Sequence, residues 1–118
     1  GGDDDPLDII EIGQSILDRG SVHQVKILGS LAMIDQSELD WKIIAINTED
    51  PHFEDIHDIH QVETFYPHTL SGIREWFRWY KYPDKKKLNS FDLDEEFQDK
   101  QFSENIIYET HLQWINRN

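Results

Sequence analysis

The sequence predicts an α+β domain in which a small barrel or curled sheet comes first and helices then pack on its outside. Two observations predict this class: short β-branched runs dominate the first part of the chain, and apolar residues recur at three- and four-residue spacing in the second. A length of 118 residues suffices for one hydrophobic core. We expect a single domain over 1–118, with barrel strands in about 1–48 and mainly helical structure in about 49–118.

Three short runs in the first part have the composition of β-strands. β-branched residues and alternating apolar residues favour extended backbone, and clusters of Asp, Gly, Ser and Gln between the runs favour turns. Gly13 ends the first run. The expected strands are Asp8–Ile12, Val25–Ile27 and Ile43–Ile46, and the expected turns are Asp18–Ser21 and Asp35–Glu38.

Helical patterns begin after Pro51. We expect a short helix in Asp55–Glu63, with His57 and His60 three residues apart on one face. Two histidines at this spacing can bind a transition metal, but the sequence indicates no third ligand. Solvated histidines are the more common case.

A longer helix is expected from Pro67, which suits a first helical turn, to just before Pro83. Its apolar stripe should pack on the sheet, and we expect the tryptophans of the chain to be core residues. The stripe consists of Leu70, Ile73, Trp76, Phe77 and Tyr80.

The last helix is expected after a loop from Asp84 to about Lys100. Ser103 can cap its N-terminus, and Ile107, Trp114 and Ile115 then share one face.

The charge balance restricts the partners. The chain has 11 Lys and Arg against 24 Asp and Glu, a net charge of −13, which argues against nucleic-acid binding and against an anionic membrane surface. The negative net charge instead favours a cation as a binding partner. With no cysteine, any metal must be held by oxygen or imidazole, and the chain fits a reducing compartment. No apolar run approaches the roughly 20 residues of a membrane span.

The densest group of carboxylates is Asp3-Asp4-Asp5-Pro6-Leu7-Asp8. In extended backbone Asp3 and Asp5 point to the same side, and Pro6 bends the chain so that Asp8 can converge with them. Such hard oxygens repel one another unless divalent cations offset the charge. The alternative is a frayed acidic terminus. The start at Gly1 and Gly2 also suggests a piece of something longer.

A second group surrounds the expected turn at Asp35–Glu38. Asp40 and Lys42 lie two residues apart on a strand, so both should project from the same face. A carboxylate for metal beside an ammonium for phosphate oxygen suits a metal–phosphate site. The alternative is an ordinary surface ion pair.

A third group is Tyr80-Lys81-Tyr82-Pro83-Asp84-Lys85-Lys86-Lys87, where a helix end supplies a hydroxyl and several ammonium groups. Anion binding and a simple favourable interaction with the helix dipole explain it equally well.

Together these segments resemble one family, the family I soluble inorganic pyrophosphatases. Gly2–Asp8 is similar to the family signature, which runs Asp, a small or polar residue, Asp, Pro, an apolar residue, Asp. Asp35–Ile46 resembles the family's next acidic turn and strand. Glu75–Asp84 resembles a helix end of the eukaryotic branch, and Glu109–Trp114 resembles that branch's last helix.

The resemblance implies Mg²⁺-dependent hydrolysis of inorganic diphosphate to two phosphates by metal-activated water, with several Mg²⁺ ions per site and Mn²⁺ as a possible substitute. It implies that Asp3, Asp8 and Asp40 hold one metal, that Asp8 touches a second, and that Asp35 with Asp40 serves metal arriving with substrate. Asp5 would be the general base. The phosphate groups would be bound by Lys42, Tyr80 and Lys81, with Lys86 a weaker candidate.

The resemblance also implies an OB-like barrel, a homodimer and a cytoplasmic location. The family's other active-site groups, a lysine, glutamates, an arginine and a tyrosine, lie upstream of the Asp signature, so this chain would be a C-terminal portion with weak or no activity alone. Its barrel would lack the first strands, leaving edges to be covered, paired or swapped. Lys85 stands where the family has glycine and Lys87 where it often has proline, so we expect the loop after Tyr82 to differ in shape.

Two other functions remain open. A phosphatase of the haloacid dehalogenase type also uses Asp-x-Asp with Mg²⁺, although its motif follows a strongly apolar strand that Gly1-Gly2 does not offer. The second open function is that of a non-catalytic acidic module, which binds divalent cations or a partner protein.

Overall fold

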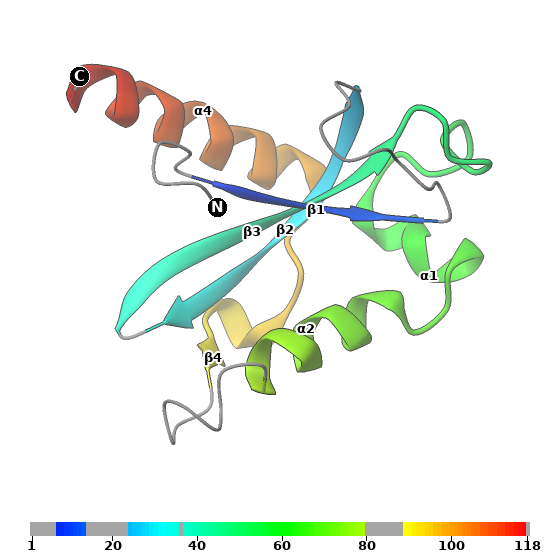
Figure 1. The fold of residues 1–118 in the computed structure, drawn as a ribbon, viewed down its shortest axis with the longest axis horizontal. Helices are drawn as coiled ribbons and strands as arrows, with labels where there is room; N and C mark the ends of the chain where they lie inside the picture. The colour runs from blue at the N-terminus through cyan, green and yellow to red at the C-terminus, as the bar shows by residue number, and fades with distance from the viewer. Residues whose placement is uncertain (1–6, 14–23, 36, 80–88, 118) are drawn as a thin grey trace.

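The computed structural model describes residues 7–13, 24–35, 37–79 and 89–117, with side chains described up to residue 111. The expected turn Asp18–Ser21 and the side chains of Trp114 and Ile115 therefore lie outside the described part. The described elements confirm the α+β class: strands precede helices, and helices lie on both sides of one sheet (Figure 1).

The sheet has four strands in the order β1-β3-β2-β4. Their bounds are β1 Asp8–Ile12, β2 Val25–Asp35, β3 Glu38–Asn47 and β4 Ser90–Phe91. β1 runs parallel to β3, whereas β2 pairs with β3 and with β4 in antiparallel fashion. All three expected strands are present, and two of them extend well beyond the apolar runs that predicted them.

β2 and β3 form a long hairpin. Asp35 pairs with Glu38, and Ser37 in the connection has a φ of 67°, the left-handed conformation that tight hairpin turns require. A bulge follows Ile27, and the backbone approaches closely at Gly29, where a Cβ would lie 2.4 Å from the Gln98 carbonyl oxygen. The expected turn at Asp35–Glu38 is thus confirmed.

Two helices cover opposite faces of the sheet, α2 (Thr69–Trp79) and α4 (Lys100–Arg117) (Figure 1). On the face toward α2, Leu31 and Met33 of β2 and Phe91 of β4 form one buried cluster with Phe77 of the helix. On the other face the Ser103 hydroxyl of α4 lies 2.7 Å from Ser30 Oγ of β2. Residues alternate between faces along a strand, so neighbouring residues of β3 meet different helices.

The last helix begins earlier than expected. Asp99 is its N-cap residue, because Asp99 Oδ1 accepts a hydrogen bond from the Phe102 N–H at 2.9 Å and the helix starts at Lys100. Ser103 is fully buried inside the first turn, where it contacts Ser30. The prediction that Ser103 caps this helix is wrong.

The segment between sheet and α2 differs from the single short helix expected in Asp55–Glu63. A 3₁₀ turn η1 (Ile59–Gln61) leads into α1 (Val62–Phe65). Asp58 and Gln61 form a capping box at the start of η1. His57 therefore precedes the helical turns, and the prediction that His57 and His60 share a helix face is wrong.

The C-terminal end of α2 is closed by the buried Asn89. Asn89 Nδ2 donates to the Phe77 carbonyl at 2.7 Å, and the Asn89 N–H donates to the Arg78 carbonyl at 3.1 Å. Arg78 also forms ion pairs with Glu75 at 2.8 Å and Glu95 at 2.6 Å. These contacts fix the position of the helix end.

Two boundaries around α2 were predicted imperfectly. The helix begins at Thr69, two residues after Pro67. The region expected as a plain loop up to about Lys100 contains β4 and a 3₁₀ turn, η2 (Leu93–Glu95). Among the described residues, no helix combines the length and apolar character that crossing a bilayer requires.

Candidate active site

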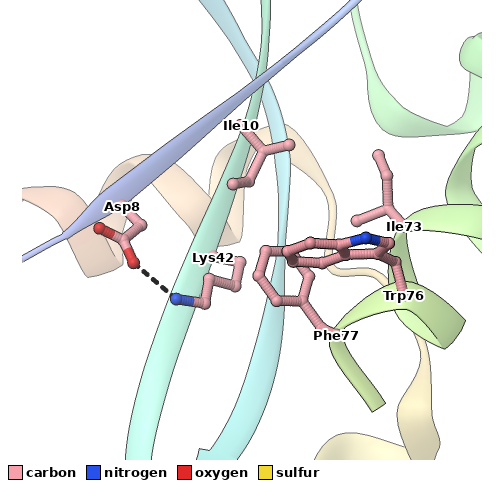
Figure 2. A pocket seen from close by; sticks show the side chains of 6 residues that line it. All are labelled: Asp8, Ile10, Lys42, Ile73, Trp76 and Phe77. Atoms are coloured by element: carbon pink, nitrogen blue, oxygen red, sulfur yellow. Dashed lines mark hydrogen bonds and ion pairs between the residues drawn. The ribbon is translucent and has the colours of Figure 1, made fainter. Parts of the chain in front are cut away.

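The parallel pairing of β1 with β3 brings Asp8 opposite Lys42. Lys42 Nζ donates a hydrogen bond to Asp8 Oδ2 at 2.5 Å (Figure 2). Asp40 lies two residues before Lys42 on β3, hence on the same face, and its Oδ2 lies 3.1 Å from Lys42 Nζ. Two carboxylates from two strands thus converge on one ammonium group.

Lys42 is almost completely buried, with 4% of its surface exposed. Burial alone would lower the pKa of Lys42, but hydrogen bonds to Asp8 and Asp40 outweigh it, and the pKa is raised. The hydrogen bond from Lys42 in turn lowers the pKa of Asp8. The pairing is therefore not the exposed surface ion pair that the sequence left open as an alternative.

Phe77 closes the site from the side of α2. Its ring centroid lies 5.1 Å from Lys42 Nζ, within the range of a cation–π contact. Phe77 was predicted only as part of an apolar stripe. Its spacing indicated the face toward the sheet, but no sequence signal indicated that this face meets a charged side chain.

Asp35 lies on the same face, further along the hairpin. Met33 pairs with Asp40 and Asp35 pairs with Glu38, so the antiparallel register places Asp35 and Asp40 on one side of the sheet. Asp35 is half-buried at the end of β2. Glu38 shares this face as well and was not among the predicted site residues.

The remaining predicted site residues lie outside the described part of the chain. These are the signature carboxylates and the groups after α2, namely Asp3, Asp5, Tyr80, Lys81 and Lys86. Lys85 and Lys87, where the sequence departs from the family pattern, also lie there.

The described donors agree in chemistry with a hard divalent cation, because Asp8, Asp35 and Asp40 offer carboxylate oxygens. Within the described ranges, however, no three Asp, Glu, His or Cys side chains gather closely enough to hold a metal ion. The donor set fits Mg²⁺ or Mn²⁺ in kind but needs further ligands.

A pocket of about 430 Å³ opens beside the Asp8–Lys42 pair. Apart from this pair its walls are apolar, and Figure 2 shows their side chains converging from β1 and α2: Ile10, Ile73, Trp76 and Phe77. Trp76 is 59% exposed, so the prediction that it is a core residue is wrong. Helical spacing placed it beside Phe77, but spacing alone does not show how far the surface opposite a side chain extends.

Among the described residues, His57 and His60 belong to no cluster of three potential metal ligands. His57 Nδ1 lies 3.2 Å from Lys26 Nζ, and His60 is highly exposed beside Asp58. The His60 side chain is 76% exposed.

Sequence comparison identifies relatives over nearly the whole chain. The profile of the family described as inorganic pyrophosphatase matches residues 1–115. A probable inorganic pyrophosphatase of Plasmodium falciparum is 54% identical over 97% of this chain, and the mitochondrial inorganic pyrophosphatase 2 of Mus musculus is 52% identical over 96%. The chain spans only 30% and 34% of these two proteins.

Solved structures agree with the sequence relatives. The type I inorganic pyrophosphatase of Toxoplasma gondii superposes with a TM-score of 0.92 at 44% identity, over 99% of this chain and 50% of its own. An N-terminally truncated vacuolar soluble pyrophosphatase of Trypanosoma cruzi, solved in complex with PPi, gives a TM-score of 0.90 at 45% identity, over 98% of this chain and 44% of its own. The expectation that this chain corresponds to only a portion of a family member is confirmed.

The expected α+β fold agrees with the family match over residues 1–115, and the haloacid dehalogenase alternative finds no support in that match. The chain belongs to the inorganic pyrophosphatase family.

Proposed function

We propose that this chain supplies part of the active site of an enzyme that hydrolyses inorganic diphosphate to two phosphates with Mg²⁺, and that the chain alone has weak or no activity. The observation that carries the proposal is the convergence of Asp8 and Asp40 on the buried Lys42, in a chain that matches the family over residues 1–115. The substrate agrees with the PPi bound to the T. cruzi relative.

The carboxylates have distinct proposed roles. Asp3, Asp8 and Asp40 would hold one metal ion, and Asp8 would touch a second. Asp35 with Asp40 would serve metal that arrives with the substrate. When bound, such ions lower the pKa of the attacking water and neutralise charge on the diphosphate. Asp5 would accept the proton of that water.

The cationic groups would bind phosphate oxygens. Lys42 is the described member of this set; its raised pKa keeps it protonated, and its position between two carboxylates fixes its ammonium group at the pocket edge. Tyr80 and Lys81 would add a hydroxyl and a second ammonium group, and Lys86 a weaker contact. We further propose that 1–118 form one domain.

An assay of phosphate release from diphosphate with Mg²⁺ tests this function. The chain should show little turnover, and a polypeptide that joins it to the remaining part of the P. falciparum relative should be active. In that polypeptide Asp5→Asn should abolish turnover while Mg²⁺ binding, followed by calorimetry, is largely kept. Asp55→Asn changes the same charge at an exposed position and should leave turnover unchanged. An inactive joined polypeptide would contradict the proposal and favour a non-catalytic acidic module.

Three further properties are proposals of the same kind. Mn²⁺ should substitute for Mg²⁺, because both accept carboxylate oxygens. A homodimer follows from resemblance to the eukaryotic branch and can be checked by light scattering. A cytoplasmic location agrees with the absence of cysteine, whereas two relatives are named as mitochondrial, so cell fractionation decides between these compartments.

A further inference from the structure

We propose that Lys26 is a modification site, at which its amine takes an acetyl group from an acyl phosphate while His57 accepts the proton. Neither residue lines the pocket beside Asp8 and Lys42. The inference rests on the surroundings of Lys26 and not on the proposed hydrolysis of diphosphate.

The side chain of Lys26 reaches from β2 to the segment that follows β3. Its ammonium group donates a hydrogen bond to the Phe53 carbonyl, and Nζ lies 4.1 Å from the centroid of the Phe53 ring. Nζ also lies 3.2 Å from His57 Nδ1. An ammonium group can only donate hydrogen bonds, so His57 Nδ1 is the acceptor and presents its lone pair to the lysine nitrogen.

A nucleophile with a base at hydrogen-bond distance, about 2.6–3.2 Å, is the arrangement that activates side chains for covalent chemistry. The base is held in place, because the His57 backbone N–H donates to Gln61 Oε1 at 2.7 Å and Gln61 belongs to the capping box of η1. The His57 side chain is exposed and Lys26 is half-buried. A small reagent can therefore reach the amine from the side of the imidazole.

The charges around Lys26 favour the same reaction. Burial lowers the pKa of the Lys26 ammonium group below its ordinary value, the nearby Glu54 carboxylate opposes this shift, and the Lys100 ammonium group adds to it. A lowered pKa leaves more of the amine in its neutral, nucleophilic form at a given pH. Two neighbouring ammonium groups also attract an anionic acyl donor, which an acyl phosphate is.

The step is an ordinary acyl transfer. The Lys26 ammonium group first loses one proton to water, and the neutral nitrogen then attacks the carbonyl carbon of the donor. As the N–C bond forms, the bond from that carbon to the phosphate oxygen breaks, and phosphate leaves with its electron pair. A second proton passes from Nζ to His57 Nδ1 and on to water. The amide product carries no charge over the Phe53 ring, so the modification weakens the contact between β2 and the segment after β3.

Incubation of the chain with acetyl phosphate in EDTA, followed by peptide mass spectrometry, tests the inference. The initial rate of acetylation at Lys26 should exceed that at Lys100 by at least about tenfold. Lys100 is the internal reference, because it lies in the same local field but has no described contact with an imidazole. Lys42, buried between Asp8 and Asp40, should stay unmodified.

Two histidine variants separate the role of the base from that of local charge. His57→Gln removes the proton acceptor and should lower the rate at Lys26 by at least about tenfold, with the rate at Lys100 unchanged. His60→Gln is the matched control, because His60 is an exposed histidine beside Asp58 and should leave both rates unchanged.

The proposal is overturned if Lys26 and Lys100 react at equal rates, if His57→Gln leaves the rate at Lys26 unchanged, or if both histidine variants lower it equally. Because the reaction needs no metal and no diphosphate, these outcomes do not depend on the proposed function. Selective acetylation of Lys26 in a chain that releases no phosphate from diphosphate would support the modification site and contradict neither its chemistry nor its geometry.

Discussion

Substitution of Asp8 by Asn removes one of the two negative charges that surround the buried Lys42 ammonium group. Loss of one partner of a fully buried ion pair costs about 3–5 kcal/mol, and hydrogen bonds to charged groups contribute about 1.5–3 kcal/mol. The Asp8 side chain is 22% exposed and Asp40 remains 3.1 Å from Lys42 Nζ, so the effect is smaller here. We expect the free energy of unfolding to fall by about 1–2 kcal/mol.

Urea denaturation in EDTA, followed by tryptophan fluorescence, measures this loss without interference from bound metal. Asp55→Asn is the control, because its carboxylate pairs with His52 at an exposed position and should contribute less than about 0.5 kcal/mol. On a Lys42→Met background, Asp8→Asn should cost at least about 1 kcal/mol less than in the wild type. Equal losses for Asp8→Asn and Asp55→Asn, or no coupling to Lys42, would refute the reasoning.

Two further predictions concern the supports of the site. Gly13→Ala should lower the free energy of unfolding by about 2 kcal/mol or more. Gly13 has a φ of 108°, and an added Cβ would lie 1.9 Å from Asp50 Oδ2. An unchanged midpoint of urea denaturation would contradict this prediction. Hydrogen bonds from Arg78 hold the pKa of Glu75 and Glu95 below their ordinary value of 4.5. These two ion pairs therefore stabilise the fold fully above pH 4.5, and their contribution is lost as the pH falls through the lowered pKa values. The stability difference between wild type and Arg78→Gln should therefore stay constant from pH 7 to about 5 and shrink in more acidic buffer; a difference that persists at acidic pH would count against these ion pairs.

Helix starts show where local patterns were insufficient. Ser103 is a good N-cap type, but Asp99 occupies a position with the same capability four residues earlier. The choice between them depends on Ser30, which lies 73 residues away in sequence and contacts the Ser103 hydroxyl inside the fold. A pattern confined to the helix carries no information about that contact.

Trp76 shows that local sequence patterns are also insufficient to predict which side chains are buried. Its spacing with Ile73 and Phe77 correctly indicates one helix face, yet Phe77 is buried and Trp76 is exposed. Helical periodicity gives the direction of a side chain, but the extent of the surface opposite it depends on how far the sheet reaches.

The sequence by itself determined the α+β class, the three strands and the common face of Asp40 and Lys42, because strand propensity and the two-residue alternation are local properties of the backbone. Only the tertiary structure decided that Asp8 pairs with Lys42, 34 residues away, and that Phe77 closes over the same ammonium group. Strand register and helix docking minimise the free energy of the whole fold, and a single residue's neighbours in sequence do not fix either one.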